Sequence, residues 1–354
     1  MFRIYPRDRS YGAPSNVFCM PKHRRLDILF CFLTPGGFFL KGSVHRAAAF
    51  KEVQPKDRLL RNARNTWKRY RSRPLPQEQL HVSIGEQYWR LCSNAHGLFE
   101  LFVPATEAFE RQTWMQRGCT VSWRNSTGAP IDQKHVPIAD LGIHAQRVIV
   151  SDVDDTLLLS HATRPLPRAR LLLFRNAFKR ESIPGSVAFI KSLQQGPSQS
   201  AFNPVFYLSN SEWNLYDLLL DFFYHHQYPS GPLLLRDQRV IWRDLIRNKR
   251  AFIHTHKRRW IQTLLEAYPQ YGFVLVGDAG QRDPSIYWEF LHRYPHRIEA
   301  VFIRNIQSRS RNRRRDFSGV AAGKPYFLVD DYQEAMQKAH KLRLIAGSSV
   351  AEAR

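Results

Sequence analysis

The strongest constraint on the fold of this chain is an alternation of short apolar runs and amphipathic segments that begins near residue 145. Five runs have the aliphatic and β-branched composition of buried strands: RVIV at 147–150, PVFYL at 204–208, FVLV at 273–276, IEAVFI at 298–303 and YFLV at 326–329. Segments with helical periodicity fill the gaps, at 183–195, 212–226, 257–268, 284–294 and 332–345. Strands that alternate with helices favour right-handed crossovers and a mostly parallel sheet covered on both faces. The pattern therefore predicts an α/β fold.

Residues 1–144 follow a different pattern, in which short apolar runs are separated by polar and turn residues. A turn at 94–97 followed by an alternating run is typical of an antiparallel β-hairpin. We therefore predict a small β-rich N-terminal domain at 1–144, with a sandwich as one arrangement, and an α/β domain at 145–347. A length of 354 residues fits two domains.

The stretch 22–42 combines a basic flank with an apolar run, as a signal peptide does. Asp27 and the Pro35-Gly36-Gly37 turn interrupt it, and no clear cleavage site follows. It is also too short to span a bilayer. We interpret it as a strand, a turn and a second strand, with secretion as the alternative.

The net charge of +23, with a pI of about 10.3, indicates an anionic partner. Nucleic acid, an anionic phospholipid membrane surface and a phosphorylated substrate all satisfy this requirement. The basic segment 61–74 is interpreted as a helical insert with a solvated face. The role of the arginine-rich run 304–316 stays open. A hydrophobic content of 43% excludes disorder as the overall state.

The four cysteines are widely spaced and include no C-x-x-C pair. This pattern fits neither a zinc site nor a disulfide scaffold. They are interpreted as reduced, buried thiols, from which we expect a cytoplasmic protein.

The first apolar run ends in the acidic cluster SDVDDT at 151–156. Asp152 and Asp154 are two residues apart, so in an extended chain their carboxylates point the same way. A nucleophile and a general acid/base are a common division of work between two carboxylates. The charge density suits a hard cation such as Mg²⁺. An EF-hand calcium loop is the alternative, but Thr156 and Leu157 stand where it needs an acid or amide and a glycine.

Two other predicted strands also end in polar groups. Ser209, Asn210 and Ser211 follow the second run, where a hydroxyl and backbone N–H groups can hold a phosphate; the alternative is a helix N-cap by Ser211. Asp278 follows the FVLV run, and Asp283 stands just before Pro284. Both acids can complete an oxygen shell for Mg²⁺, although Asp283 also fits a helix N-cap.

A phosphoryl-transfer site also needs a fixed positive charge. Lys257 is the candidate, because it opens the helix before the FVLV strand. Lys249, Arg250 and Arg258 compete with it. His254 and His256 form an H-x-H pair, which is more typical of a surface than of a metal site.

The ordered segments SDVDDT, VFYLSNS, a lysine and LVGDAGQRDP resemble the four motifs of the haloacid dehalogenase superfamily of phosphohydrolases. IPG at 183–185, GPLLLRD at 231–237 and GKPYFLVDDYQEA at 323–335 are similar to the catalytic domain of actin-patch type phosphatidate phosphatases. The resemblance covers about 145–345 and implies a Rossmann-like haloacid dehalogenase fold. In the N-terminal half, only HGLFEL at 96–101 is similar to the β-rich module that often precedes this domain.

The resemblance implies a role for each matching residue. Asp152 would be the nucleophile that forms an aspartyl-phosphate, and Asp154 the acid/base residue, oriented by Thr156. Lys257 would screen the charge between nucleophile and phosphate. Ser209, with Asn210 beside it, would bind phosphate. The Mg²⁺ ligands would be Asp152, the backbone carbonyl of Asp154, Asp278 and Asp283. Ala279 departs from the family, which more often has a small hydroxyl there.

The segment 157–203 is too short for a large cap domain, so an open site is expected. Such a site suits a phosphatidate-like substrate at a membrane surface. We therefore predict a Mg²⁺-dependent phosphatidate phosphatase that is peripherally membrane-associated. The alternatives are a phosphatase acting on a nucleic-acid end or another phosphorylated substrate, and a non-catalytic protein that binds anionic lipid.

Overall fold

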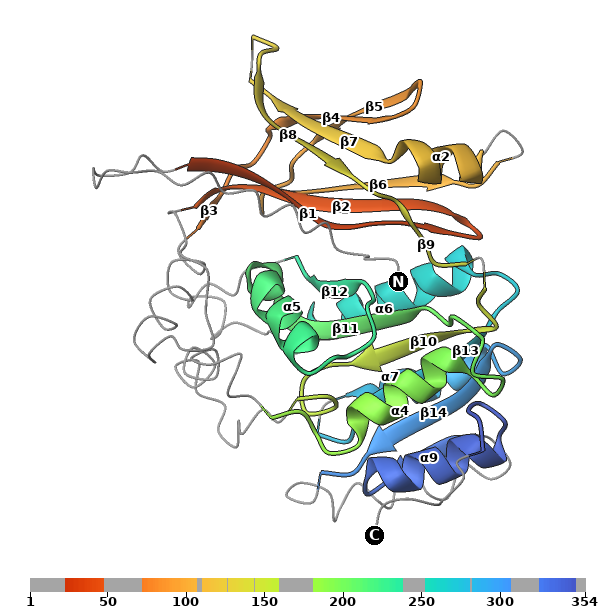
Figure 1. Ribbon diagram of the computed structural model, residues 1–354. Helices are drawn as coiled ribbons and strands as arrows, with labels where there is room; N and C mark the ends of the chain where they lie inside the picture. The colour runs from red at the N-terminus through yellow and green to blue at the C-terminus, as the bar shows by residue number, and fades with distance from the viewer. Residues whose placement is uncertain are drawn as a thin grey trace.

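A computed structural model describes residues 23–47, 72–106, 110–125, 127–142, 144–158, 181–237, 252–280, 282–306 and 325–347. A β-rich N-terminal part lies against an α/β part (Figure 1). Most of the basic segment 61–74 and of the run 304–316 lies outside the described residues, so the helical insert stays a prediction.

The α/β part is built on a six-stranded sheet in which all neighbouring strands are parallel. Its strands are β10 (Arg147–Asp152), β11 (Val205–Glu212), β12 (Leu233–Arg236), β13 (Gly272–Asp278), β14 (Ile298–Arg304) and β15 (Tyr326–Val329). The spatial order β12-β11-β10-β13-β14-β15 is the 3-2-1-4-5-6 order of a doubly wound Rossmann sheet. All five predicted strands are present. β12 was not predicted: its LLLR sequence is as short as that of β15 but lacks the β-branched and aromatic residues that favour strands.

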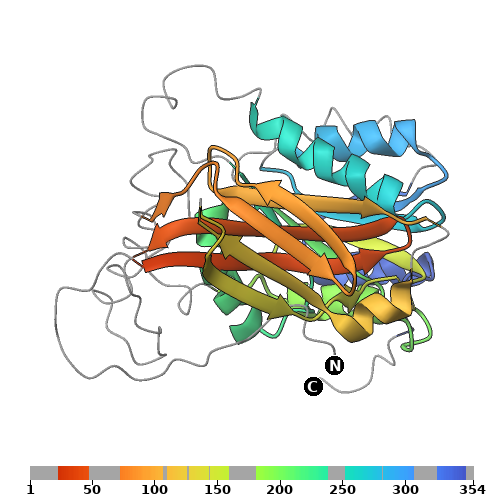
Figure 2. The same cartoon turned by 90° about the horizontal axis from the view of Figure 1, so that it is seen from above.

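Helices cover both faces of this sheet, as the predicted crossovers require. They are α4 (Ser186–Gln195), α5 (Tyr216–His225), α6 (Phe252–Ala267), α7 (Asp283–Arg293) and α9 (Tyr332–Lys341), with a short 3₁₀ turn, η2 (Trp213–Leu215), before α5. Figures 1 and 2 together place α6 and α7 on one face and α4 and α5 on the other. α9 packs beside α4, where the rings of Phe189 and Tyr332 are 5.4 Å apart.

The N-terminal part is a sandwich of two sheets, as Figure 2 shows from above. One sheet contains β1 (His23–Thr34), β2 (Gly37–Ala47), β3 (Arg73–Pro74), β6 (Leu98–Pro104) and β9 (Ala139–Asp140). The other contains β4 (Gln79–Ile84), β5 (Gln87–Cys92), β7 (Cys119–Arg124) and β8 (Pro130–Val136), and helix α2 (Arg111–Arg117) lies between β6 and β7 in the chain. Apolar side chains of both sheets share one core, which includes Leu26, Phe38, Val121 and Trp123. The predicted strand, turn and strand at 22–42 is the β1–β2 hairpin.

Strand β1 is buried on both of its faces. An irregularity in its pairing between Ile28 and Phe30 lets Cys31 and Leu33 face the sandwich core while Phe30 and Phe32 face the α/β part. The Phe32 ring packs edge-on against Phe206 of β11, with centroids 5.7 Å apart. A strand buried on both sides reads as an almost continuous apolar run, which explains the LFCFL sequence in β1.

Backbone and ionic contacts join the two parts as well. The Gly36 N–H donates to the Ala267 carbonyl at 2.8 Å, and a Cβ at Gly36 would lie 2.9 Å from the Ala267 Cα. Lys41 places its ammonium 2.6 Å from Asp237 Oδ1. The sheet that contains β1 therefore shares a hydrophobic core with the α/β part.

The structure also bears on the predicted burial of the cysteine thiols and on membrane-spanning helices. Cys31 and Cys119 are buried thiols, but Cys92 is exposed because it lies on the outer face of β5, so the prediction of buried thiols is wrong for Cys92. None of the helices in the described ranges has both the length and the apolar composition needed to cross a bilayer.

We expect Phe32→Ala to lower the free energy of unfolding by about 3–5 kcal/mol, because it leaves a cavity between β1 and β11. Urea unfolding, followed by tryptophan fluorescence and by circular dichroism, should show one transition in both signals. The substitution should move its midpoint to a lower urea concentration. Phe202→Ala, at a side chain that is 39% exposed, should cost less than about 1 kcal/mol. Two separate transitions, of which only one moves, would show that the two parts fold independently.

Candidate active site

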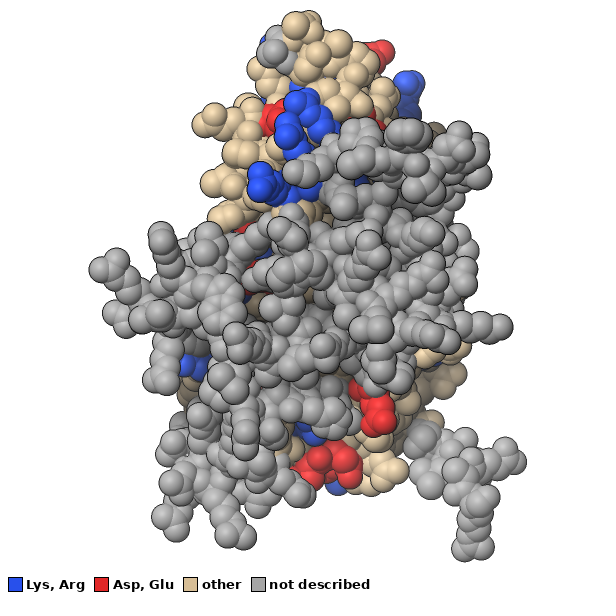
Figure 3. Space-filling model, turned by 90° about the vertical axis from the view of Figure 1, so that its left-hand side faces the viewer, with Lys and Arg blue, Asp and Glu red and all other residues tan. Residues whose placement is uncertain are grey.

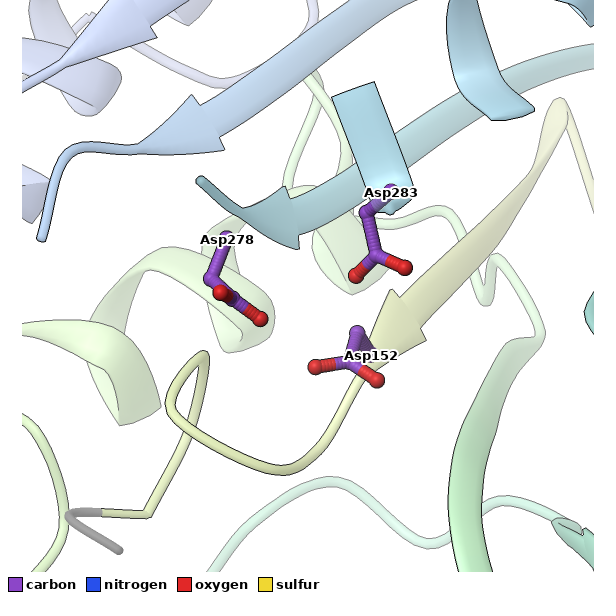
Figure 4. A group of neighbouring side chains, drawn as sticks. All are labelled: Asp152, Asp278 and Asp283. Carbon is purple, nitrogen blue, oxygen red and sulfur yellow. The ribbon is translucent and has the colours of Figure 1, made fainter. Parts of the chain in front are cut away.

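Three aspartates meet where the strand order of the parallel sheet reverses, between β10 and β13. Asp152 ends β10, Asp278 ends β13, and Asp283 begins α7. Figure 4 shows the three carboxylates turned toward one another. One oxygen from each lies within 4.8 Å of the others, and all three residues are buried. Ligands of doubly wound sheets bind at this switch point, so it is the candidate active site.

Lys257 supplies the positive charge of the site. Its side chain extends from the second turn of α6 and is 1% exposed. The ammonium lies 2.6 Å from Asp152 Oδ1 and also contacts Asp283 Oδ1. The competing Arg258 instead pairs with Glu289 at the surface, 2.7 Å away. Lys249 and Arg250 lie outside the described residues.

Thr156 contacts a different carboxylate from the one expected. Its hydroxyl donates to Asp152 Oδ2 at 3.0 Å, whereas the sequence interpretation had it orient Asp154. The turn after β10 brings residue 156 back over the strand end, because the Leu157 N–H bonds to the Val153 carbonyl at 3.0 Å. Both oxygens of Asp152 are therefore held by donors, which fixes the plane of the carboxylate.

Asp154 lies beside the three-aspartate group, and its carboxylate is not one of that group. Its Oδ2 accepts a hydrogen bond from Ser209 at 2.9 Å and a longer one from Ser211 at 3.4 Å. Ser209 is buried, and Asn210 next to it is half-buried. The predicted phosphate residues thus adjoin the second carboxylate, while metal ligation by the Asp154 backbone carbonyl stays a prediction.

Ser211 adjoins the site, and the alternative of a helix N-cap at this residue is not what the structure shows. β11 continues to Glu212, and the helical turn starts only at Trp213, with Glu212 as its N-cap. Residues 209 and 211 of an extended strand point the same way, which brings both hydroxyls to Asp154. The sequence pattern that indicates this arrangement is S-x-S at the end of a strand. Asp283, for which a helix N-cap was also an alternative, is the first residue of α7, and Arg282 is the N-cap.

The pKa values of the site follow from burial and crowded charge. Burial raises the pKa of Asp152 well above its ordinary value; Lys257 lowers it, but less, and Asp283, Asp278 and Asp154 raise it further. Burial and the charge of Asp283 raise the pKa of Asp278 to about 7. Burial lowers the pKa of Lys257, but the carboxylates of Asp152 and Asp283 raise it by more, so the ammonium keeps its proton.

The donor set fits a hard divalent cation. When all three buried acids are ionised, they and the one ammonium leave an excess of two negative charges, which is costly in a buried site. Asp283 Oδ2 is buried and has no hydrogen-bond donor among the described residues. Gly277 permits this crowding, since a Cβ there would lie 2.9 Å from Asp283 Oδ2. Oxygen ligands of this kind are those that Mg²⁺ prefers.

His256 has a structural role next to the site. Its Nε2 lies 3.0 Å from the Leu234 carbonyl, and burial lowers its pKa to about 4, so the neutral ring donates this bond. The contact ties the start of α6 to β12, one residue before Lys257. The interpretation of the H-x-H pair as surface residues is therefore wrong for His256; the His254 side chain is not among those described.

We expect the free energy of unfolding of the metal-free protein to fall as pH rises from about 4 to about 7. In this interval the folded state keeps a proton on Asp278, whose pKa is about 7, while the unfolded state has released it at about 3.9. Asp152, with its raised pKa, acts in the same direction. The check is urea unfolding with a chelator at pH 5 and pH 7. Asp278→Asn should flatten the decrease, and an unchanged slope in that variant would contradict the assignment.

Comparison with known proteins finds sequence similarity over the part of the chain that contains this site. The sequence profile of the family described as "Phosphatidate phosphatase APP1, catalytic domain" matches residues 147–305. The phosphatidate phosphatase APP1 of Saccharomyces cerevisiae is 29% identical over 160 residues, which are 44% of this chain and 25% of that protein. An uncharacterized protein of Schizosaccharomyces pombe is 28% identical over 176 residues, or 49% of this chain and 26% of its own length.

Among solved structures, the Pnkp1/Rnl/Hen1 complex matches with a TM-score of 0.31 and 18% identity over 51% of this chain and 56% of that chain. The chain spans about a quarter of the length of the two yeast relatives. The matched segment contains β10 to β14 and with them every residue of the candidate site. Residues 147–305 are thus similar to the catalytic domain of the APP1 type of phosphatidate phosphatase.

Proposed function

We propose that this protein is a Mg²⁺-dependent phosphatase of the haloacid dehalogenase type that hydrolyses phosphatidate to diacylglycerol and phosphate. The observation that carries the proposal is the Asp152 carboxylate, fixed at the switch point between Lys257 and Thr156 and adjoined by two more buried carboxylates. The site offers a nucleophile, an acid/base residue and a fixed cation within one cluster of charged side chains. This is the set that phosphoryl transfer needs.

In the first step, an oxygen of Asp152 attacks the phosphorus atom of the phosphomonoester and forms an aspartyl-phosphate. The bond from phosphorus to the glycerol oxygen breaks, and Asp154 donates its proton to that oxygen. Its two serine contacts set the direction in which Asp154 delivers the proton. Lys257 offsets the negative charge that gathers between nucleophile and phosphate.

In the second step, Asp154 acts as a base. It removes a proton from a water molecule whose oxygen attacks the phosphorus of the aspartyl-phosphate. The bond between phosphorus and the Asp152 oxygen breaks, phosphate leaves, and Asp154 is again protonated for the next turnover. One carboxylate thus serves as acid and then as base.

Asp152, Asp278 and Asp283 would hold Mg²⁺, together with the Asp154 backbone carbonyl that the family resemblance implies. When bound, the ion neutralises charge on the phosphoryl oxygens and orients them. The excess of two negative charges in the buried cluster supports this assignment.

The substrate class rests on the relatives and on the distribution of charge. The described residues carry 23 Lys and Arg and 23 Asp and Glu, so the excess of 23 positive charges lies entirely outside them. Three arginine-rich segments follow strands β10, β12 and β14 along the chain, namely 159–180, 238–251 and 307–324. Strands β10 and β14 point to the left in Figure 1, and Figure 3 shows this side of the molecule face on. The basic side chains of described residues that are visible there gather on the N-terminal sandwich. An excess of positive charge supports peripheral binding to anionic lipid.

We expect the purified protein to release phosphate from phosphatidate in mixed micelles with Mg²⁺, and Asp152→Asn to lower kcat by about 10⁴-fold or more, since the nucleophile is lost. Asp217→Asn makes the same change on the surface of α5 and should keep wild-type activity. A side-by-side assay with a 3′-phosphorylated oligonucleotide separates the substrate classes. Preference for the oligonucleotide would overturn the lipid assignment, and no turnover of any phosphomonoester would favour a non-catalytic lipid-binding protein.

Binding to vesicles that contain phosphatidate should weaken strongly when NaCl rises from about 0.1 M to about 1 M, because the Debye length falls from ~10 Å to ~3 Å. Each basic residue near an anionic surface contributes about 1 kcal/mol at low salt. Co-sedimentation with anionic and with neutral vesicles measures the effect. Equal binding to both vesicle types at every salt concentration would contradict an electrostatic attachment.

A further inference from the structure

The turn after β10, residues 153–158, is held by side chains from three separate parts of the chain. Three consecutive carbonyls in it accept a hydrogen bond from a distant side chain. Arg304 donates to the Asp155 carbonyl from Nε at 3.1 Å and from Nη2 at 2.7 Å. The hydroxyl of Tyr332 donates to Thr156 at 2.6 Å, and that of Tyr228 to Leu157 at 2.8 Å. The turn that carries Asp154 is thus fixed from outside as well as by its own backbone bonds.

Arg304 differs from the two tyrosines in its position. Tyr228 and Tyr332 are buried in the hydrophobic core, where a hydroxyl group needs a partner in any case. Arg304 is the last residue of β14 and lies in register with Asp278 of β13. It directs two donors to a single carbonyl, one residue after Asp154. Its guanidinium therefore links the edge of the sheet to the turn that carries the acid/base residue.

The backbone of the turn needs such a link. Asp155 has a φ of 60°, in the left-handed region that residues with a Cβ seldom adopt. A residue in this region persists only where its surroundings enforce the conformation. If Asp155 relaxed, the preceding peptide would rotate, and the Asp154 carboxylate would leave Ser209. The two hydrogen bonds from Arg304 act directly on the strained residue.

We propose that Arg304 is a positioning residue that keeps the turn in the conformation in which Asp154 faces Ser209 while Asp152 faces Lys257. This inference rests on the proposed function for its catalytic consequence, because it concerns the placement of the acid/base residue. Arg304 touches a backbone carbonyl and not the reacting atoms. Its loss should therefore lower kcat and leave KM nearly unchanged, since the phosphate contacts stay in place.

Arg297 offers a matched control at the opposite end of the same strand. It precedes β14 and also donates to backbone carbonyls, including that of Tyr271 at 2.9 Å and that of Leu265 at 3.3 Å. Its carbonyl partners lie at the end of α6 and before β13, at the edge of the sheet away from the three aspartates. A purely structural arginine of this kind should affect stability without a specific effect on catalysis.

The experiment compares Arg304→Met, Arg304→Lys and Arg297→Met in the full chain, with phosphatidate as substrate. We expect Arg304→Met to lower kcat by about 10²-fold, the size of effect that a misplacement of about 1 Å produces. Arg304→Lys keeps the charge and one donor and should lose about 10-fold. Arg297→Met should lower the unfolding temperature while kcat stays within about twofold of the wild-type value. KM should stay within about twofold in all three variants.

Hydrogen exchange gives a readout that does not depend on activity. In Arg304→Met and Arg304→Lys, a peptide covering 151–158 should exchange faster, because its backbone bonds open more often. In Arg297→Met that peptide should exchange at the wild-type rate. The inference is wrong if Arg304→Lys, the variant most certain to fold, keeps both the exchange rate of this peptide and kcat, or if Arg297→Met lowers kcat equally. A wild-type protein without phosphatase activity, but with the expected exchange pattern, would refute the proposed function alone.

Discussion

The buried contact between the Lys257 ammonium and the Asp152 carboxylate is the interaction on which the rest of the structure depends. Three carboxylates without a nearby cation would be too costly to bury at the end of a sheet. The lysine has to reach the switch point from α6, so the start of this helix must be held in place. The bond between His256 and Leu234 does so from inside the α/β part.

The N-terminal sandwich holds the same helix from the other side. The Phe30 ring packs against Trp260, one turn of α6 beyond Lys257, with centroids 6.0 Å apart. At the end of α6, the Gly36 N–H bonds to the Ala267 carbonyl. The β-rich part is therefore a support for the helix that carries Lys257. Because β1 packs in two cores at once, loss of its packing should disturb the candidate site through α6.

The location of the site was predictable, but several contacts within it were not. Carboxyl ends of parallel strands meet at one edge of a sheet, so the acids after the RVIV and FVLV runs had to lie close together. The partner of Thr156 depends on how the turn after β10 folds back, and no local pattern encodes that path. The sequence left two roles open for Ser211, because the S-x-S pattern fits a strand end and a helix cap equally well. Arg304 gave no local signal, since its partner is distant in the chain.

The sequence by itself determined the order of five of the six strands of the parallel sheet and of the helices between them, the α/β class after residue 145 and the identity of the acids at the strand ends. These follow from periodicity and local composition, which each segment carries on its own. Only the tertiary structure decided that the β-rich part shares a core with the α/β part, that Lys257 bridges two carboxylates, and that Asp154 faces two serines. These outcomes depend on contacts between segments far apart in the chain. The free energy of these contacts comes from burial of apolar side chains and from pairing of charges. Neither can be predicted from one segment alone.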